Sequence, residues 1–257
     1  GKVVSEACYS TNNGTTAYSV CPGGVSASTA SGSGANCSVS QYGGGCQHGT
    51  HVAGIVAGAN GPSGAAGVAK GANLIAVQVF SYFPSNQDVL SYSSDQIKGL
   101  ERVYALRDTY AIAAVNMSLG GGQYTSTCDS SNTAIKAAID NLRSVGIATV
   151  IASGNNGYLN AISAPACVSS AISVGATCDA SDTGYCATGV NGVAGYSNIA
   201  SFVSLLAPGS YINSSVPGGA YANWSGTSMA APMASGTPAL ALGQPLTVKR
   251  GELTQKL

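Results

Sequence analysis

Apolar residues along most of the chain follow two patterns that alternate, short continuous runs and longer helical repeats. The short runs predict buried strands at 74–80, 111–117, 147–152, 171–174 and 202–207. Apolar residues three or four positions apart predict helices at 48–58, 94–109, 132–145 and 228–242. We expect Ser94 or Asp95 to cap the second helix and Gly146 to end the third. Strands that alternate with helices predict an α/β fold with a mostly parallel sheet between helices.

The two ends of the chain depart from this alternation. Residues 1–47 begin with a strand-like run at 2–6 and continue as a stretch rich in Gly, Ser, Ala and Thr that contains four cysteines. This composition offers little to bury, so we expect a long surface excursion held by disulfides. Residues 244–257 form a polar tail, and the sequence shows no linker. The whole chain, 1–257, is therefore predicted to be one domain.

The balance of charge excludes several classes of partner. Only 8% of the residues are charged and 45% are hydrophobic, which excludes a disordered chain. Basic and acidic residues number 10 each, so no net field attracts nucleic acid or an anionic membrane. No stretch approaches the roughly 20 apolar residues that cross a bilayer.

The 8 cysteines predict disulfides rather than a metal centre. None of them has Cys-x-x-Cys spacing, and only 2 histidines are present, so no metal site is predicted. An even number of cysteines favours disulfides and hence a secreted protein. Proximity along the chain favours the pairs Cys8–Cys21, Cys37–Cys46 and Cys178–Cys186, which leaves Cys128–Cys167. Some buried free thiols are the alternative.

Three polar, glycine-containing segments are placed where the predicted strands end. They are 116–121 (NMSLGG), 152–157 (ASGNNG) and 226–228, at the start of the last helix. The carboxyl ends of parallel strands meet at one edge of a sheet, which is where ligands bind in open α/β folds. We therefore expect these segments to form a single site.

Two further motifs indicate the chemistry of that site. A serine hydroxyl is a weak nucleophile until a neighbouring base accepts its proton. Both histidines lie in the segment 47–54 (QHGTHVAG), which resembles the catalytic-histidine motif of the subtilase family of serine proteases. The segment 225–232 (SGTSMAAP) resembles the nucleophile motif of the same family. The resemblance covers roughly residues 40–235 and implies a subtilisin-like three-layer fold.

The resemblance implies a role for each matching residue. His48 is the general base and acid, and Ser228 is the nucleophile that forms an acyl-enzyme. Asn155 and the backbone N–H of Ser228 donate to the oxyanion, with Asn156 as the alternative to Asn155. His51, one turn further along the helix, is expected to be structural.

The same resemblance implies where a peptide substrate would bind. Ser118, Leu119 and Gly120 match the extended segment that pairs with the substrate and walls its first specificity pocket. Gly154 is expected to contact the substrate as well. Pairing of this kind adds a strand, and glycines allow close approach.

The chain departs from the family pattern at two places. Subtilases have an aspartate before the catalytic histidine, at the end of an early strand, but here only Glu6 is acidic before His48. Glu6 as a substitute is the lesser alternative to a chain truncated before His48. After Pro232 the family's long apolar helix is altered, and Pro238 is expected to kink it. We expect reduced activity and self-association through exposed sheet edges.

Alternative functions follow from the same residues. The Gly-x-Ser-x-Gly motif of α/β-hydrolases is absent, but an acyl-enzyme site can also act on small esters. A catalytically impaired subtilase fragment is the non-enzymatic alternative. No cofactor is predicted to be required. Asp179 and Asp182 leave structural calcium as an option.

Overall fold

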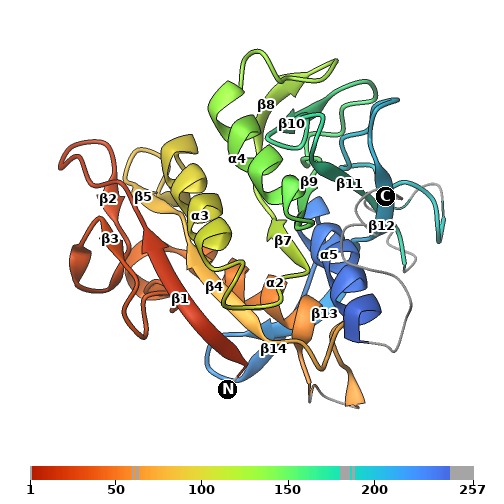
Figure 1. The fold of residues 1–257 in the computed structure, drawn as a ribbon. Coiled ribbons are helices and arrows are strands. Elements are labelled where there is room, and N and C mark those ends of the chain that lie inside the picture. The colour runs from red at the N-terminus through yellow and green to blue at the C-terminus, as the bar shows by residue number, and fades with distance from the viewer. Residues whose placement is uncertain (1, 60, 62–63, 180–185, 187–188, 244–257) are drawn as a thin grey trace.

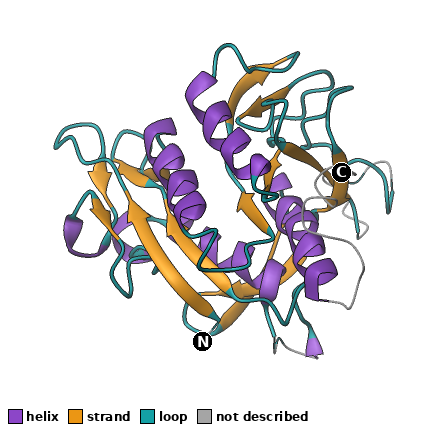
Figure 2. Ribbon diagram, in the orientation of Figure 1, coloured by secondary structure: helices purple, strands orange, loops and turns teal. Residues whose placement is uncertain are grey.

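The computed structural model describes residues 2–59, 61, 64–179, 186 and 189–243. Helices separate groups of strands in the middle of the chain, and six described strands follow one another before the last helix (Figures 1 and 2). The strands are β1 (Val3–Tyr9), β2 (Tyr18–Ser19), β3 (Ala27–Ser28), β4 (Leu74–Gln78), β5 (Ser81–Phe83), β6 (Asp88–Leu90), β7 (Ala114–Met117), β8 (Gly121–Tyr124), β9 (Ala148–Ala152), β10 (Ile162–Ala164), β11 (Ile172–Thr177), β12 (Leu205–Pro208), β13 (Ile212–Val216) and β14 (Ala220–Trp224). The helices are α1 (Val39–Tyr42), α2 (His48–Ala57), α3 (Ser93–Ala105), α4 (Thr133–Ser144) and α5 (Thr227–Gly243), with 3-10 turns η1 (Pro22–Gly24) and η2 (Gly44–Gln47).

A four-stranded parallel sheet, in the order β12-β11-β9-β7, forms the centre of the molecule. Every residue of β9 is buried, as the continuous apolar run predicted. Ile151 packs into a cluster with residues of α3 and α4, whereas Val150 packs with Ala230 and Ala231 of α5. Because neighbouring side chains of a strand point to opposite faces, helices cover both faces of this sheet. The predicted α/β three-layer fold is confirmed.

A second sheet, in the order β3-β1-β4, shows that residues 1–47 do more than cover the surface. β1 runs parallel to β4, with Glu6 opposite Ala76 and Cys8 opposite Gln78. Ala7 and Cys8 are fully buried. The prediction of a segment with little to bury was wrong here, because the strand continues to Tyr9 instead of ending at Glu6.

The two sheets are joined by helices instead of strands. β4 and β7 each lie at an edge of their own sheet, and no strand in the described ranges pairs with both. Helix α3 packs with α4, and α2 packs with α5, across the boundary between the sheets. Figure 1 shows α3 and α4 next to each other in front of the strands. The carboxyl ends of β7 and β9 therefore belong to one sheet, and α2 reaches that sheet through α5.

All four predicted disulfides are present, Cys8–Cys21, Cys37–Cys46, Cys128–Cys167 and Cys178–Cys186. The longest loop that they close, of 39 residues, ties the segment before α4 to the segment between β10 and β11. Cys37 and Cys46 also belong to a small apolar cluster with Val20 and Val89. Disulfides and apolar packing together therefore hold the loops that precede α2.

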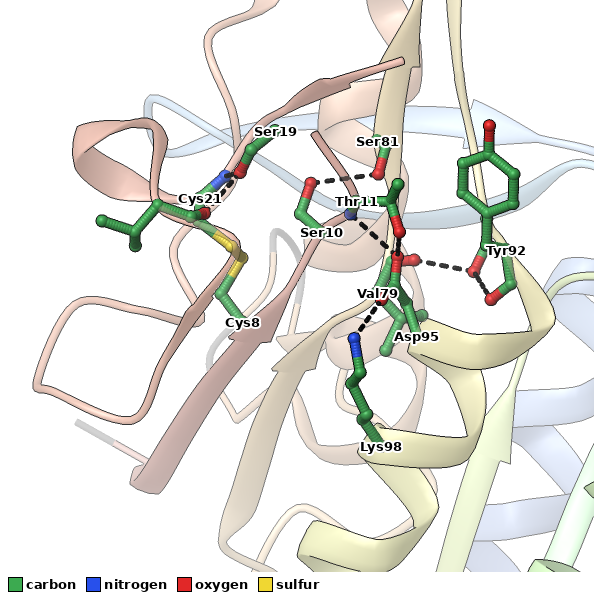
Figure 3. A network of polar contacts seen from close by, with 12 residues as sticks. Cys8, Ser10, Thr11, Ser19, Cys21, Val79, Ser81, Tyr92, Asp95 and Lys98 are labelled. Carbon is green, nitrogen blue, oxygen red and sulfur yellow. Dashed lines mark hydrogen bonds and ion pairs between the residues drawn. A yellow bond between two sulfur atoms is a disulfide. The ribbon is translucent and has the colours of Figure 1, made fainter. Parts of the chain in front are cut away.

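Several predicted boundaries shift, and one predicted cap is wrong. Helix α3 begins at Ser93 and has no side-chain cap. Asp95 instead accepts hydrogen bonds from the backbone N–H and hydroxyl of Thr11, at 2.8 and 2.7 Å, and pairs with Lys98 at 3.1 Å (Figure 3). The buried carboxylate thus holds the chain that leaves β1. Gly146 ends the region of α4 as predicted, with φ of 75°.

Helix α5 extends over Thr227–Gly243, close to the predicted 228–242, and includes Pro238. The kink expected at Pro238 stays a prediction. The predicted polar tail, 244–257, lies outside the described residues. No described helix has the length and apolar character needed to cross a membrane.

Candidate active site

Ser228 is the second residue of α5 and is half-buried. The Ser118 hydroxyl, just after β7, donates to the Ser228 carbonyl oxygen at 2.8 Å. The Ser228 hydroxyl lies 3.5 Å from the Ser118 carbonyl oxygen, the long limit of a hydrogen bond. Because the first N–H groups of a helix have no partner within it, the Ser228 N–H can donate to a bound anion. The structure therefore brings the 116–121 segment and the start of α5 together.

Asn155 follows β9 and lies beside the start of α5. Its Oδ1 accepts hydrogen bonds from the backbone N–H and the hydroxyl of Thr227, both at 2.8 Å. The Thr227 hydroxyl also accepts from the Gly154 N–H at 3.2 Å. With Oδ1 held, the exposed amide group of Asn155 keeps its two N–H donors for a ligand, since neither bonds to any described residue.

Asn156, the alternative to Asn155, is held elsewhere. Its backbone N–H donates to Oδ1 of Asn198 at 2.9 Å, and its own Oδ1 lies 3.4 Å from Nδ2 of Asn198. Of the two neighbours, Asn155 is the one bonded to the residue before Ser228. The geometry therefore favours Asn155 as the oxyanion donor.

His48 is the first residue of α2 and is half-buried. Its ring is nearly parallel to the indole of Trp224, with 6.4 Å between centroids and 13° between planes. The pKa of His48 is lowered from 6.5 to about 4, mainly by burial and to a lesser extent by the charge of His51, against the opposing effect of the Asp88 charge. His48 is thus a neutral base at neutral pH. Its ring makes no hydrogen bond to Ser228 within the described chain.

His51 has the contacts of a structural residue, as predicted. It is completely buried, and its Nε2 lies 3.0 Å from the carbonyl oxygen of Ala222. Its ring stacks on Trp224 with 4.3 Å between centroids. Burial lowers the pKa of His51, against the opposite effect of the Ala222 and Ile212 carbonyls. His51 therefore ties α2 to the β13–β14 hairpin.

None of the described carboxylates forms a hydrogen bond or ion pair with the His48 ring. Glu6 accepts from the Gly32 N–H at 2.6 Å, and Asp95 is bonded to Thr11 and Lys98. Asp88 raises the pKa of His48 through its charge, but it accepts its hydrogen bond from the Val89 N–H at 2.7 Å. Orientation of His48 by a bonded carboxylate is not observed in this part of the chain.

The expected substrate wall lies between β7 and β8. A Cβ added to Gly120 would lie 3.0 Å from the Ala164 carbonyl oxygen and 3.2 Å from Cβ of Ser163, so only glycine fits without a shift. Gly154 has φ of 110°, and a Cβ there would collide with Asn198 and Ser163. Leu119 packs against the core of α3 and α4. Close packing thus requires glycine at both positions 120 and 154.

The described residues contain no group of three or more His, Cys, Asp or Glu side chains that could hold a metal. Asp182, one of the two residues that suggested calcium, lies outside the described residues. Structural calcium stays a prediction.

Sequence reasoning missed four residues around the site, Thr227, Trp224, Asp88 and Asn198. Thr227 directly precedes the serine within the recognised motif, so its position was a usable signal. Trp224 is the single tryptophan of the chain and lies four positions before Ser228. Asp88 was missed because acids were sought only before His48. Nothing in the sequence around Asn198 marks it.

Comparisons with a family model, with known sequences and with a solved structure all identify similarity to subtilisin-like proteins over most of the chain. A model of the subtilase family matches residues 7–251. Subtilisin NAT of Bacillus subtilis subsp. natto and Subtilisin E of Bacillus subtilis (strain 168) are each 35% identical over 219 residues, 84% of this chain and 51% of theirs. The crystal structure of a cold-adapted subtilisin-like serine proteinase matches with a TM-score of 0.62 and 33% identity, over 81% of this chain and 66% of that one. The chain spans about half the length of the two subtilisins.

Proposed function

The chain belongs to the subtilase family, and from this premise we propose that it is a secreted serine hydrolase that cleaves peptide bonds through an acyl-enzyme on Ser228. One observation carries the proposal. Thr227 holds Oδ1 of Asn155 with two hydrogen bonds of 2.8 Å, and the two N–H donors of the Asn155 amide bond to no described residue. Donors that are held in place before the reaction are the main source of oxyanion stabilisation.

The proposed reaction proceeds in two halves. The Ser228 oxygen attacks the peptide carbonyl carbon while His48 accepts the hydroxyl proton, and the Asn155 amide and the Ser228 N–H bind the resulting oxyanion. His48 then gives the proton to the leaving nitrogen, the C–N bond breaks, and the acyl group remains on Ser228. Water attacks this ester with His48 as base, which releases the acid and restores the serine.

The histidine is the weak part of this mechanism. Its pKa of about 4 makes it a poor base, and no described carboxylate is bonded to its ring. In subtilisin, loss of the triad aspartate alone lowers turnover by about 3 × 10⁴. Esters need less protonation of the leaving group than amides, so small esters are the second candidate substrates and should react faster than peptides here.

The proposed compartment of the enzyme follows from its disulfides, and its proposed partners follow from the substrate wall and the sheet edges. Four disulfides favour an oxidising compartment, which supports secretion. The proposed partners are peptide or protein substrates that pair with residues 118–120. Self-association through the open edges of β4 and β7 stays a prediction, because open edges accept further strands.

The test is reaction of the purified chain with a fluorophosphonate probe. Ser228 displaces fluoride and forms a bond to phosphorus, while His48 takes the hydroxyl proton. We expect labelling that is absent in Ser228→Ala, reduced in His48→Ala and unchanged in Ser225→Ala, an exposed serine three positions away. Ester and casein assays then rank the two substrate classes. A folded wild type without labelling would leave an impaired subtilase fragment as the correct description.

A further inference from the structure

The side chain of Asn198 is completely buried, and hydrogen bonds use its polar atoms on both sides. Oδ1 accepts from the backbone N–H groups of Asn156 and Tyr158, at 2.9 and 3.1 Å. Nδ2 donates to the Ser153 carbonyl oxygen at 3.2 Å and to the Ser163 hydroxyl at 3.3 Å, and lies 3.4 Å from Oδ1 of Asn156. A buried amide with this many partners holds several chain segments in one arrangement.

The backbone of Asn198 binds the same loop. Its N–H donates to the Gly154 carbonyl oxygen at 2.9 Å, and its carbonyl oxygen accepts from the Ser153 hydroxyl at 2.8 Å. Residues on both sides of Asn155 are therefore bonded to Asn198, while Asn155 itself is exposed. Asn198 thus holds the loop on both sides of Asn155, the proposed oxyanion donor.

The Ser163 contact extends this network to the substrate wall. Ser163 lies in β10, which pairs with β8, and its hydroxyl donates to the Gly122 carbonyl oxygen at 3.1 Å. Its Cβ also borders Gly120. One side chain thus connects the loop that carries Asn155 with the wall that would receive the substrate.

We propose that Asn198 is a positioning residue that sets the loop 153–158, so that the Asn155 amide meets the oxyanion, and aligns this loop with the wall at Ser163. The proposal rests on the proposed function. Asn198 acts through Asn155 and does not touch the reacting atoms.

The kinetic test is a double-mutant cycle on the rate of fluorophosphonate labelling. Asn198→Asp keeps the acceptor for Asn156 and Tyr158 but removes the donors to Ser153 and Ser163. We expect it to slow labelling at least tenfold in the wild type and less than threefold in Asn155→Ala, because the loop then carries no donor to misplace. An equal loss in both backgrounds, or no loss, would overturn the proposal.

A matched control separates positioning from lost stability. Ser10 is also completely buried and accepts from the Val20 N–H at 3.0 Å, but it follows β1 in the other sheet (Figure 3). Ser10→Ala removes a buried backbone partner there and should leave the labelling rate of the folded protein within twofold of the wild type. A slowing by Ser10→Ala equal to that of Asn198→Asp would assign the effect to stability and overturn the proposal.

Hydrogen exchange tests the same proposal without any activity. In the wild type, the amides of Asn156 and Tyr158 should be protected although their loop lies near the surface. Asn198→Ala should lower this protection at least tenfold and Asn198→Asp should keep it, with the amides of β9 unchanged in both. Amides that exchange freely in the wild type, or equally in all three proteins, would overturn the proposal. If the wild type does not label, the proposed function fails and exchange alone decides the role of Asn198.

Discussion

Ser228 and Asn155 lie in a densely hydrogen-bonded part of the molecule, whereas His48 lies at the start of α2, where its ring makes no hydrogen bond to a described residue. On the first side, Thr227, Ser118 and Asn198 bind the loops that carry the two residues. On the second side, His48 has a neighbouring indole at 6.4 Å and a pKa lowered by burial. The two sides differ in how firmly each proposed catalytic group is held.

The difference shows which of the two catalytic tasks, oxyanion stabilisation or proton transfer, the folded chain is better arranged to perform. Oxyanion donors work because they are oriented before charge develops. Here two hydrogen bonds from Thr227 orient the amide of Asn155, the proposed donor. A histidine base needs a fixed tautomer and a partner for its cation, which no described carboxylate provides. We therefore expect charge stabilisation to be nearly complete and proton transfer to limit the rate.

The largest effect should come from breaking the firmly held side. Asn155→Ala removes a preorganised donor, so we expect the rate of ester turnover to fall by about 10²–10³, the size reported for such donors. Asn156→Ala, which leaves the Thr227 contacts intact, is the control and should stay within about threefold. Equal losses in the two variants would show that the donor is not Asn155.

The second effect is the pH dependence of the labelling rate, which reports on the protonation of the loosely held His48. Only neutral His48 can accept the proton, and its pKa is about 4. The labelling rate should therefore rise with pH, reach half of its maximum near pH 4, and fall about tenfold per unit below that. A midpoint near 6.5 would contradict the burial of the ring.

The same pKa links protonation to stability. Unfolded His48 titrates near 6.5 and the folded residue near 4, so the unfolded chain binds more protons between these values. This contribution to stability is complete above about pH 6.5 and is lost as the pH falls toward 4. Circular dichroism at each pH is needed so that loss of rate is compared only among folded samples.

The sequence predicted the firmly held side better than the loosely held one, for a physical reason. Ser228 and Asn155 follow strands or begin a helix, and strand order alone brings such positions together. The contacts of Asp88 and Trp224 with the histidine region depend on how loops and a hairpin fold back from other parts of the chain. The role of Asn198 could not be predicted, because a single asparagine in a loop belongs to no repeating pattern. Only the folded structure shows which groups it binds.

The strand at residues 3–9 gives the same lesson. The sequence predicted only a strand-like run at 2–6, and the Gly-, Ser-, Ala- and Thr-rich composition of the following stretch indicated a surface segment. Pairing with β4 nevertheless buries Ala7 and Cys8 completely. Parallel pairing between segments some 70 residues apart cannot be derived from local pattern, because the partner supplies the burial.

A smaller effect, a rise in the pKa of His48, should follow when the His48 ring is exposed to water. Burial is the largest cause of the lowered pKa of His48, and Trp224 lies against its ring and that of His51. Trp224→Leu should admit water and move the pKa of His48 up from about 4 toward 6.5. Titration of the ring protons by NMR measures the shift. Tyr221→Leu, an exposed position on the same hairpin, is the comparison, and an equal shift there would assign the change to the hairpin as a whole.

The smallest effect concerns Asp88, the acidic residue in the described part of the chain whose charge acts on His48. Asp88 raises the pKa of His48 by its charge alone, so Asp88→Asn should lower that pKa by less than about one unit. Because Asp88 is exposed, salt should screen the interaction, and the difference between variant and wild type should shrink between 0.01 and 1 M salt, roughly as the Debye length falls from 30 to 3 Å. Asp108→Asn, an exposed acid paired with Arg107, is the control. A pKa that rises in Asp88→Asn, or a shift that resists salt, would mean that Asp88 bonds to the ring and that the histidine side is better held than the contacts indicate.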